Sequence, residues 1–126
     1  MRPDRLGFAK DSEDLAAGFL RSRGYRILER NYRNCFGEID IIARHKKFIC
    51  FLEVKARRSD FYGTPQEAVS AAKQRRISRV ALGYLKSKGL LDQPARFDVV
   101  GISCAADGTK IKLITGAFEL SPHFTP

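Results

Sequence analysis

The chain has 126 residues, of which 44% are hydrophobic and 29% are charged, a balance that argues against disorder. This length fits one domain, residues 1–126, with a core large enough to need no disulfide or structural metal. The 23 Lys and Arg residues against 14 Asp and Glu residues give a net charge of +9, which favours a polyanionic partner such as nucleic acid or an anionic membrane surface.

Cysteine use and the N-terminal segment indicate the compartment. Three cysteines, at positions 35, 50 and 104, fit neither a disulfide framework nor a zinc motif, so we expect buried or half-buried thiols in a reducing compartment. The segment MRPDRLGFAKDSED carries charges where a secretion signal needs an apolar run, and no stretch approaches the roughly 18 apolar residues of a membrane helix. The sequence therefore predicts a cytoplasmic protein without a membrane partner.

The first predicted elements are a helix and a strand. Apolar residues at helical spacing predict a helix over about 12–23, with Asp11 or Ser12 as N-cap and Gly24 after its end. The aromatic and branched residues of YRILERNY predict a strand over 25–32.

A hairpin follows. GEIDIIAR over 37–44 and FICFLEVKAR over 48–57 both have strand propensity, and a short basic turn at Lys46 and Lys47 separates them. A two-residue turn pairs His45 with the residue at 48, so paired residue numbers sum to 93 throughout the hairpin.

The second half of the chain predicts a helix and two strands. TPQE over 64–67 has the form of a capping box with proline at the first helical position, so we expect a helix from there to about Lys88, ending at Gly89. RFDVVGIS over 96–103 and KIKLITGAF over 110–118 predict strands around an Asp-Gly turn. The order α-β-β-β-α-β-β implies an α/β fold with a mixed sheet: an antiparallel meander, then a right-handed helical crossover to a strand parallel to the third.

The hairpin brings acidic residues together. Strict alternation places Glu38, Asp40 and Ile42 on one side of the first hairpin strand and the residues at 39, 41 and 43 on the other. In the register that sums to 93, Asp40 faces Glu53 and Glu38 faces Lys55. Two carboxylates opposite each other repel unless a positive charge lies between them.

A divalent cation would supply that charge. Carboxylate-only ligation favours a hard cation such as Mg²⁺, which leaves room for waters and a phosphate. Lys55 shares the face with Asp40 and Glu53 and would stabilise charge on a phosphate, which together indicate phosphodiester hydrolysis. A cross-strand ion-pair cluster on a solvated face is an equally good interpretation of the pattern alone.

The two predicted helices add further candidates. Glu13 aligns with the apolar face of the first helix, either as part of the site or as a favourable charge near a helix N-terminus. Lys73 lies within the apolar arc of the second helix, pointing to the carboxylates or to bound phosphate, or else snorkelling to the helix edge. Arg75, Arg79 and Lys86 form a basic stripe on the opposite side that could follow a phosphate backbone.

GEIDIIA followed by FLEVKAR closely resembles the YraN-like family of predicted endonucleases, which are related to archaeal Holliday junction resolvases. The resemblance covers nearly the whole chain, including SEDLAAGFL, GYRILERNYR, RFDVV and the terminal GAF. It implies the restriction-endonuclease-like αβββαβ core of the PD-(D/E)xK nuclease group, a mixed sheet flanked by helices, with Mg²⁺ as the usual metal.

The resemblance also assigns roles to residues of this chain. It implies that Asp40 is the metal-binding aspartate and Glu53 the second acidic ligand, and that the carbonyl of Val54 contacts the metal. Lys55 matches the catalytic lysine, and Glu13 matches the acidic residue of the first helix.

The chain departs from the family pattern at two positions: Ile39 replaces the proline that names the group, and Ser12 stands where relatives often have glycine. Neither change removes a charged group. The sequence thus predicts a Mg²⁺- or Mn²⁺-dependent endodeoxyribonuclease whose partner is DNA, with branched DNA among the candidate forms. A non-catalytic nucleic-acid-binding or assembly module is the alternative, and an RNA-directed partner shares the same charge. Resolvase relatives commonly act as dimers, so a homodimer is an expectation.

Overall fold

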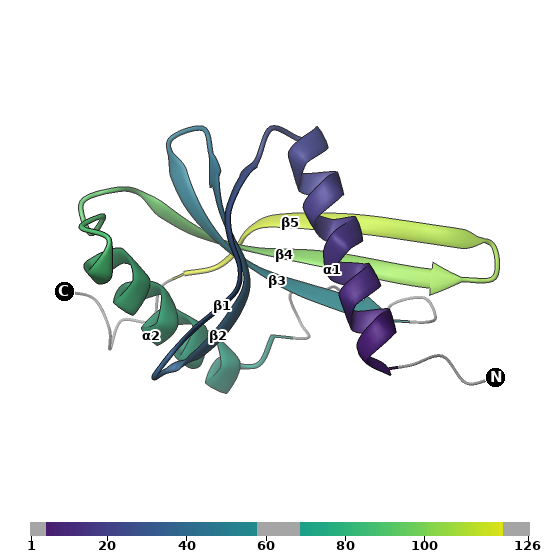
Figure 1. Ribbon diagram of the computed structural model, residues 1–126, viewed down its shortest axis with the longest axis horizontal. Helices are drawn as coiled ribbons and strands as arrows, with labels where there is room; N and C mark the ends of the chain where they lie inside the picture. Colours follow the sequence, from purple (N-terminus) through teal and green to yellow (C-terminus); the bar gives the residue numbers. More distant parts are fainter. Residues whose placement is uncertain (1–4, 58–68, 120–126) are drawn as a thin grey trace.

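The computed structural model describes residues 5–57 and 69–119 and has the predicted α/β order (Figure 1). No helix in these two ranges is both long and apolar enough to cross a membrane. In chain order the elements are α1 (Arg5–Ser22), β1 (Arg26–Asn34), β2 (Gly37–His45), β3 (Phe48–Arg57), α2 (Ala71–Ser87), β4 (Ala95–Ala105) and β5 (Gly108–Phe118).

The five strands form one mixed sheet in the order β1-β2-β3-β4-β5. β1, β2 and β3 are antiparallel neighbours, β4 is parallel to β3, and β5 is antiparallel to β4. The parallel pair requires a crossover, which α2 provides. The predicted meander, followed by a strand parallel to the third, is therefore confirmed.

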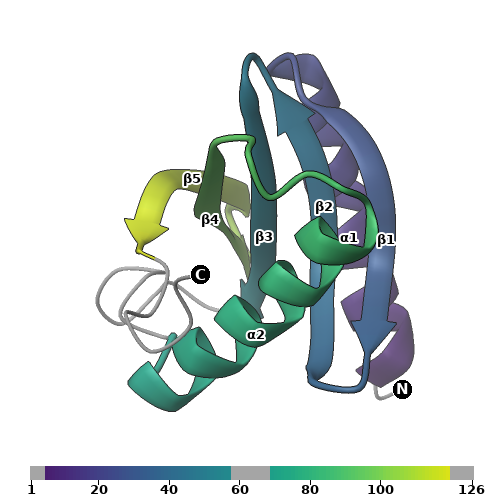
Figure 2. The ribbon, with the colours of Figure 1, turned by 90° about the vertical axis from the view of Figure 1, so that its left-hand side faces the viewer.

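The two helices cover opposite faces of the sheet (Figure 2). Each helix packs on its own cluster of buried apolar side chains. The cluster under α2 includes Ile42, Phe51, Ile77, Val80, Tyr84 and Val99. The cluster under α1 includes Ala16, Leu20, Ile41, Leu52, Val100 and Ile102. Because both faces of the sheet are covered, the central strands are apolar on both sides.

Both helices begin at residues other than those predicted. The first helix begins at Arg5 and therefore already includes Asp11 and Ser12, the two residues expected to cap it. The second helix begins at Ala71, after Ser70. The backbone of Ser70 is extended, and its side-chain oxygen accepts a hydrogen bond from the N–H of Lys73 at 3.2 Å. The capping box at 64–67 lies outside the described residues, but a continuous helix from there to Lys88 is wrong.

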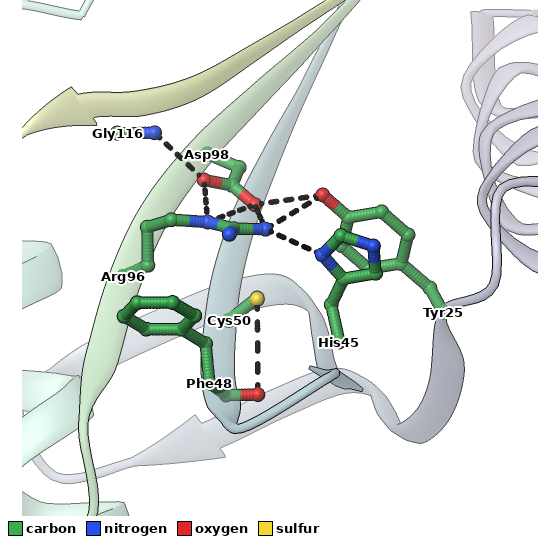
Figure 3. A network of polar contacts seen from close by, with 7 residues as sticks. All are labelled: Tyr25, His45, Phe48, Cys50, Arg96, Asp98 and Gly116. Carbon is green, nitrogen blue, oxygen red and sulfur yellow. Dashed lines mark hydrogen bonds and ion pairs between the residues drawn. The ribbon is translucent and has the colours of Figure 1, made fainter.

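A polar network joins the α1–β1 junction to the centre of the sheet (Figure 3). Asp98 in β4 is fully buried, and its carboxylate accepts hydrogen bonds from Arg96 at 2.9 to 3.2 Å and from the Tyr25 hydroxyl at 3.1 Å. The backbone N–H of Gly116 donates to the same carboxylate at 2.9 Å from an irregular part of β5. Arg96 also donates to Nδ1 of His45 at 3.1 Å, since a guanidinium has no acceptor.

Candidate active site

The predicted acidic pair lies where β2 and β3 stop pairing. The register that sums to 93 is confirmed from His45–Phe48 to Ile41–Leu52, and regular pairing ends there, one step before Asp40. In place of a backbone partner, Val54 donates its N–H to Oδ2 of Asp40 at 2.8 Å. The Asp40 carboxylate therefore points toward β3, into the gap between the two strands.

Strict alternation along β2 is wrong at this point. Ile39 packs in the cluster under α2 together with Ile42, whereas Ile41 packs under α1. The alternation of sides thus slips by one residue at Asp40. The physical reason is the hydrogen bond from Val54, which turns the aspartate toward its neighbouring strand instead of out of the sheet.

Glu53 is the most buried carboxylate of the site. Its side chain is 6% exposed, and Oε2 lies 2.9 Å from Nζ of Lys73 on α2. Burial and the nearby negative charge of Asp40 raise the pKa of Glu53 to about 7, although Lys73 opposes this shift. Burial likewise raises the pKa of Asp40, against the hydrogen bond from Val54. Both carboxylates are therefore costly to ionise without a further positive charge.

Two lysines face this acidic pair. Burial lowers the pKa of Lys55, and the positive charge of Lys73 lowers it further. Burial also opposes the charge on Lys73, but the ion pair with Glu53 outweighs it, so the pKa of Lys73 is raised. Of the positions that the sequence left open for Lys73, the structure shows the one toward the carboxylates, with Glu53 as its partner.

Glu13 approaches the site from α1. Burial raises its pKa, and the charge of Asp40 raises it further, so the two carboxylates lie close enough to interact. The side-chain amide of Asn31 on β1 donates to both Glu13 oxygens, at 3.1 and 3.2 Å, in the orientation that gives both groups partners. Asn31 has a left-handed backbone, with φ +52°, a conformation that asparagine tolerates better than most residues.

A cleft of about 530 Å³ opens beside the acidic pair. Its lining comes from the end of β1, the β1–β2 turn, the start of β2, one residue of β3 and the first half of α2. The residues that line it are Arg33, Asn34, Cys35, Phe36, Gly37, Glu38, Asp40, Glu53, Lys73, Arg76 and Ile77. A ligand in this cleft would therefore contact both carboxylates and Lys73.

Comparison with known proteins identifies the family. The model of the family described as "Uncharacterised protein family UPF0102" matches residues 12–102. The chain is 54% identical over 121 residues to a UPF0102 protein of Syntrophus aciditrophicus, covering 96% of this chain and 91% of the relative. It is 52% identical over 110 residues to UPF0102 protein GSU0650 of Geobacter sulfurreducens, with 86% of each chain covered. A UPF0102 protein of Symbiobacterium thermophilum is 50% identical over 116 residues, covering 91% of this chain and 97% of the relative.

This chain belongs to the UPF0102 family. The part that the family model matches includes Glu13, Asp40, Glu53 and Lys55, the four side chains that converge from α1, β2 and β3. The geometry of this UPF0102 protein thus joins residues that lie up to 42 positions apart in the sequence, from 13 to 55.

The donor set of the site fits a hard cation. Within 5–57 and 69–119, no three His, Cys, Asp or Glu side chains gather closely enough to hold a metal ion. Asp40 and Glu53 alone would therefore supply the carboxylates, a number that Mg²⁺ commonly uses. The N–H and C=O groups of one residue in a strand point toward the same neighbouring strand. Because the N–H of Val54 donates to Asp40 on β2, the carbonyl of Val54 faces the same gap between β2 and β3.

The basic stripe of α2 is separate from Lys73, the residue of the same helix that contacts the acidic pair. Arg75, Arg79 and Lys86 are exposed, as the sequence predicts, whereas Lys73 is partly buried against Glu53. The stripe therefore offers solvent-facing positive charge along the helix that carries Lys73.

Sequence reasoning missed the residues that support these groups. Asn31 gave no signal beyond its tolerance of left-handed backbone, and its contact with Glu13 depends on the tertiary fold. His45 was expected only as the last paired residue before the hairpin turn, but it also stacks on Tyr25 with ring centroids 4.2 Å apart. Asp98 could have been found, because a charged residue inside the apolar run FDVV needs a buried partner.

Proposed function

We propose that this UPF0102 protein is a metal-dependent endonuclease that hydrolyses phosphodiester bonds in DNA. The observation that carries the proposal is the meeting of two carboxylates, buried Glu53 and half-buried Asp40, with raised pKa values in one cleft beside two lysines. Ionisable groups whose pKa values are shifted by burial and by like charges in a cleft are typical of functional sites.

Asp40 and Glu53 would hold Mg²⁺ or Mn²⁺, and the carbonyl of Val54 would complete the protein's share of the ligands. When bound, such an ion supplies positive charge to the phosphate and a more acidic water. The oxygen-only donor set supports this choice of metal over softer ions. The resemblance of GEID and EVK to the PD-(D/E)xK motifs supports the same assignment.

The remaining residues would act on the substrate and on water. Lys55 would donate to a non-bridging phosphate oxygen and stabilise its growing negative charge. Glu13, held by Asn31, would orient a water molecule or take its proton. The exposed Arg75, Arg79 and Lys86 would contact the phosphate backbone beyond the cleft.

A cleavage screen tests the proposal. Wild-type protein is incubated with Mg²⁺ or Mn²⁺ and with duplex, branched and single-stranded DNA and with RNA. The matched variant is Asp40→Asn, because asparagine can still accept the hydrogen bond from Val54 while losing the charge that holds a cation. We expect metal-dependent cleavage that Asp40→Asn and Lys55→Ala reduce by at least about 100-fold. Unchanged cleavage in either variant would rule out this site.

The second candidate is a non-catalytic nucleic-acid-binding module. Its support is the ion pair between Lys73 and Glu53, which neutralises the buried carboxylate within the protein itself. Calorimetric titration with Mn²⁺ separates the two candidates. The nuclease requires a binding heat that Asp40→Asn removes, whereas the binding module requires nucleic-acid affinity that is independent of the metal.

A further inference from the structure

The β1–β2 turn presents an aromatic ring at the rim of the cleft. Phe36 is 49% exposed, and it lines the same cleft as Asp40 and Glu53. A single exposed aromatic residue is common on protein surfaces and by itself indicates no ligand. What distinguishes Phe36 is how the turn that carries it is fixed and which side chains surround it.

The turn is anchored to α2 by Asn34. Its side-chain amide donates to the carbonyl of Val80 at 3.2 Å, and its Oδ1 accepts from the N–H of Phe36 at 3.0 Å. A Cβ atom at Gly83 would lie 2.9 Å from Nδ2 of Asn34 and 3.8 Å from Cδ2 of Phe36. The absence of a side chain at Gly83 therefore leaves room for Asn34 and lets the turn pack against the helix.

Arg76 reaches the same rim across Gly37. A Cβ at Gly37 would lie 3.1 Å from Cγ and 3.2 Å from Cδ of Arg76, and the φ of Gly37 is +146°. The glycine of GEID thus gives the arginine stem room to lie over the start of β2. Within 5–57 and 69–119, Arg76 forms no ion pair, whereas the neighbouring Arg33 is paired with Glu38 at 2.6 Å.

We propose that this part of the cleft, formed by Phe36, Arg76 and Gly37, binds an unpaired nucleotide next to the phosphate to be cleaved. The base stacks on Phe36, and Arg76 binds its phosphate, a combination typical of single-strand recognition. The volume of about 530 Å³ falls in the range of small-molecule sites. A base within a duplex is covered on both faces by its neighbours, so only an unpaired or extruded base can stack on the ring.

The inference rests on the proposed function and specifies its substrate class. Nucleic acid with an unpaired nucleotide at the cleavage position would be preferred over a continuous duplex. Base stacking requires neither the metal nor catalysis, so binding can be measured in EDTA. The failure of this inference is therefore distinguishable from the failure of the proposed nuclease activity.

The test measures equilibrium binding in EDTA to two DNA probes of equal length, a duplex and the same duplex with one unpaired 2-aminopurine. Phe36→Ala removes the ring, Phe36→Trp keeps a stacking surface, and Leu91→Ala is the control, because Leu91 is similarly exposed at 47% but lies outside this cleft. We expect Phe36→Ala to weaken binding of the unpaired probe about tenfold and binding of the duplex less than about twofold. Phe36→Trp and Leu91→Ala should bind both probes like the wild type.

The fluorescence of 2-aminopurine changes when the stacking of that base changes. A change that the wild type and Phe36→Trp both produce, but Phe36→Ala does not, supports the site. Equal loss of affinity for both probes in Phe36→Ala, or no loss for either, overturns it. Absence of wild-type binding to the unpaired probe also overturns it, and the cleavage screen with Asp40→Asn then decides the nuclease proposal separately.

Discussion

Two clusters of buried charge, one around Asp98 and one around Glu53, lie on opposite faces of the same sheet. The protein compensates the charge of the two carboxylates to different extents. Asp98 accepts hydrogen bonds from Arg96, Tyr25 and Gly116, so both of its oxygens have partners from the protein. Glu53 on β3 pairs with Val99 on β4, the residue directly after Asp98. Its carboxylate forms one ion pair, with Lys73, and its pKa is raised to about 7.

The difference indicates what each cluster is for. A structural cluster is stable when every buried charge is compensated within the fold. A site that binds a ligand keeps charge whose compensation is incomplete, at a cost in stability, because the ligand completes it. By this criterion the Asp98 network is structural, whereas the incomplete compensation of Asp40 and Glu53 supports the cation site proposed above. Substitutions on the two faces should therefore affect stability in opposite directions.

The largest effect is expected for Asp98→Ala. The substitution leaves the Arg96 guanidinium, whose side chain is 17% exposed, without its carboxylate and removes the acceptor of Tyr25 and Gly116. Breaking a buried ion pair in this way costs about 3–5 kcal/mol of the free energy of unfolding. Urea denaturation measures it, with Asp92→Ala as the exposed aspartate control. A loss below about 1 kcal/mol would show that this network does not stabilise the fold.

Glu53→Gln should increase the free energy of unfolding at high pH, the opposite of the effect of Asp98→Ala. The pKa of Glu53 rises from 4.5 to about 7 on folding, so its contribution to stability is full below about pH 4.5 and is lost as pH rises through 7. Glutamine cannot ionise, so we expect the metal-free variant to gain about 1–2 kcal/mol over wild type near pH 8 and almost nothing near pH 5. Urea denaturation in EDTA at the two pH values checks this. A variant less stable than wild type near pH 8 would contradict it.

Lys73→Gln tests how far the protein itself compensates Glu53, and the quantity measured is the affinity for Mn²⁺. In the metal-free protein, Lys73 holds Glu53 at 2.9 Å and competes with a cation for that carboxylate. Removing the lysine should tighten Mn²⁺ binding about fivefold near pH 8, since a competing positive charge is lost. Isothermal calorimetry measures the change, and Arg75→Gln, an exposed charge two residues away, is the matched control. Weaker binding by Lys73→Gln than by Arg75→Gln would show that Lys73 supports the cation.

The sequence was sufficient where local rules determine structure. The two-residue turn at Lys46 and Lys47 determines the hairpin register, so the pairs from His45–Phe48 to Ile41–Leu52 could be predicted from residue numbers. The next expected pairs, Asp40–Glu53 and Glu38–Lys55, are not part of the observed register. Helical periodicity likewise placed Lys73 within the apolar arc of α2, and the structure then showed that its side chain contacts Glu53.

It was insufficient where a side chain replaces a backbone partner. The slip of alternation at Asp40 arises from its hydrogen bond to Val54, which no periodic pattern contains. Similarly, Ser70 caps α2 because its side chain satisfies the N–H of Lys73, and an alternative cap at 64–67 matched the sequence pattern equally well. The Asp98 network joins three distant segments, so the residues around position 98 could not identify its partners.

The smallest effect is expected for His45→Gln, at the edge of the Asp98 network. Burial and the charge of Arg96 lower the pKa of His45 from 6.5, because Nδ1 must stay unprotonated to accept from the guanidinium. The neutral imidazole therefore contributes stability above about pH 6.5, and that contribution is lost as pH falls through the lowered pKa. Glutamine does not titrate, so the small decrease of the urea midpoint at low pH should disappear in the variant. The decrease of the midpoint at high pH, which Glu53 causes on the other face of the sheet, should remain. If the decrease at low pH persists in His45→Gln, protonation of another group causes it, and the Arg96 contact does not depend on the state of this imidazole.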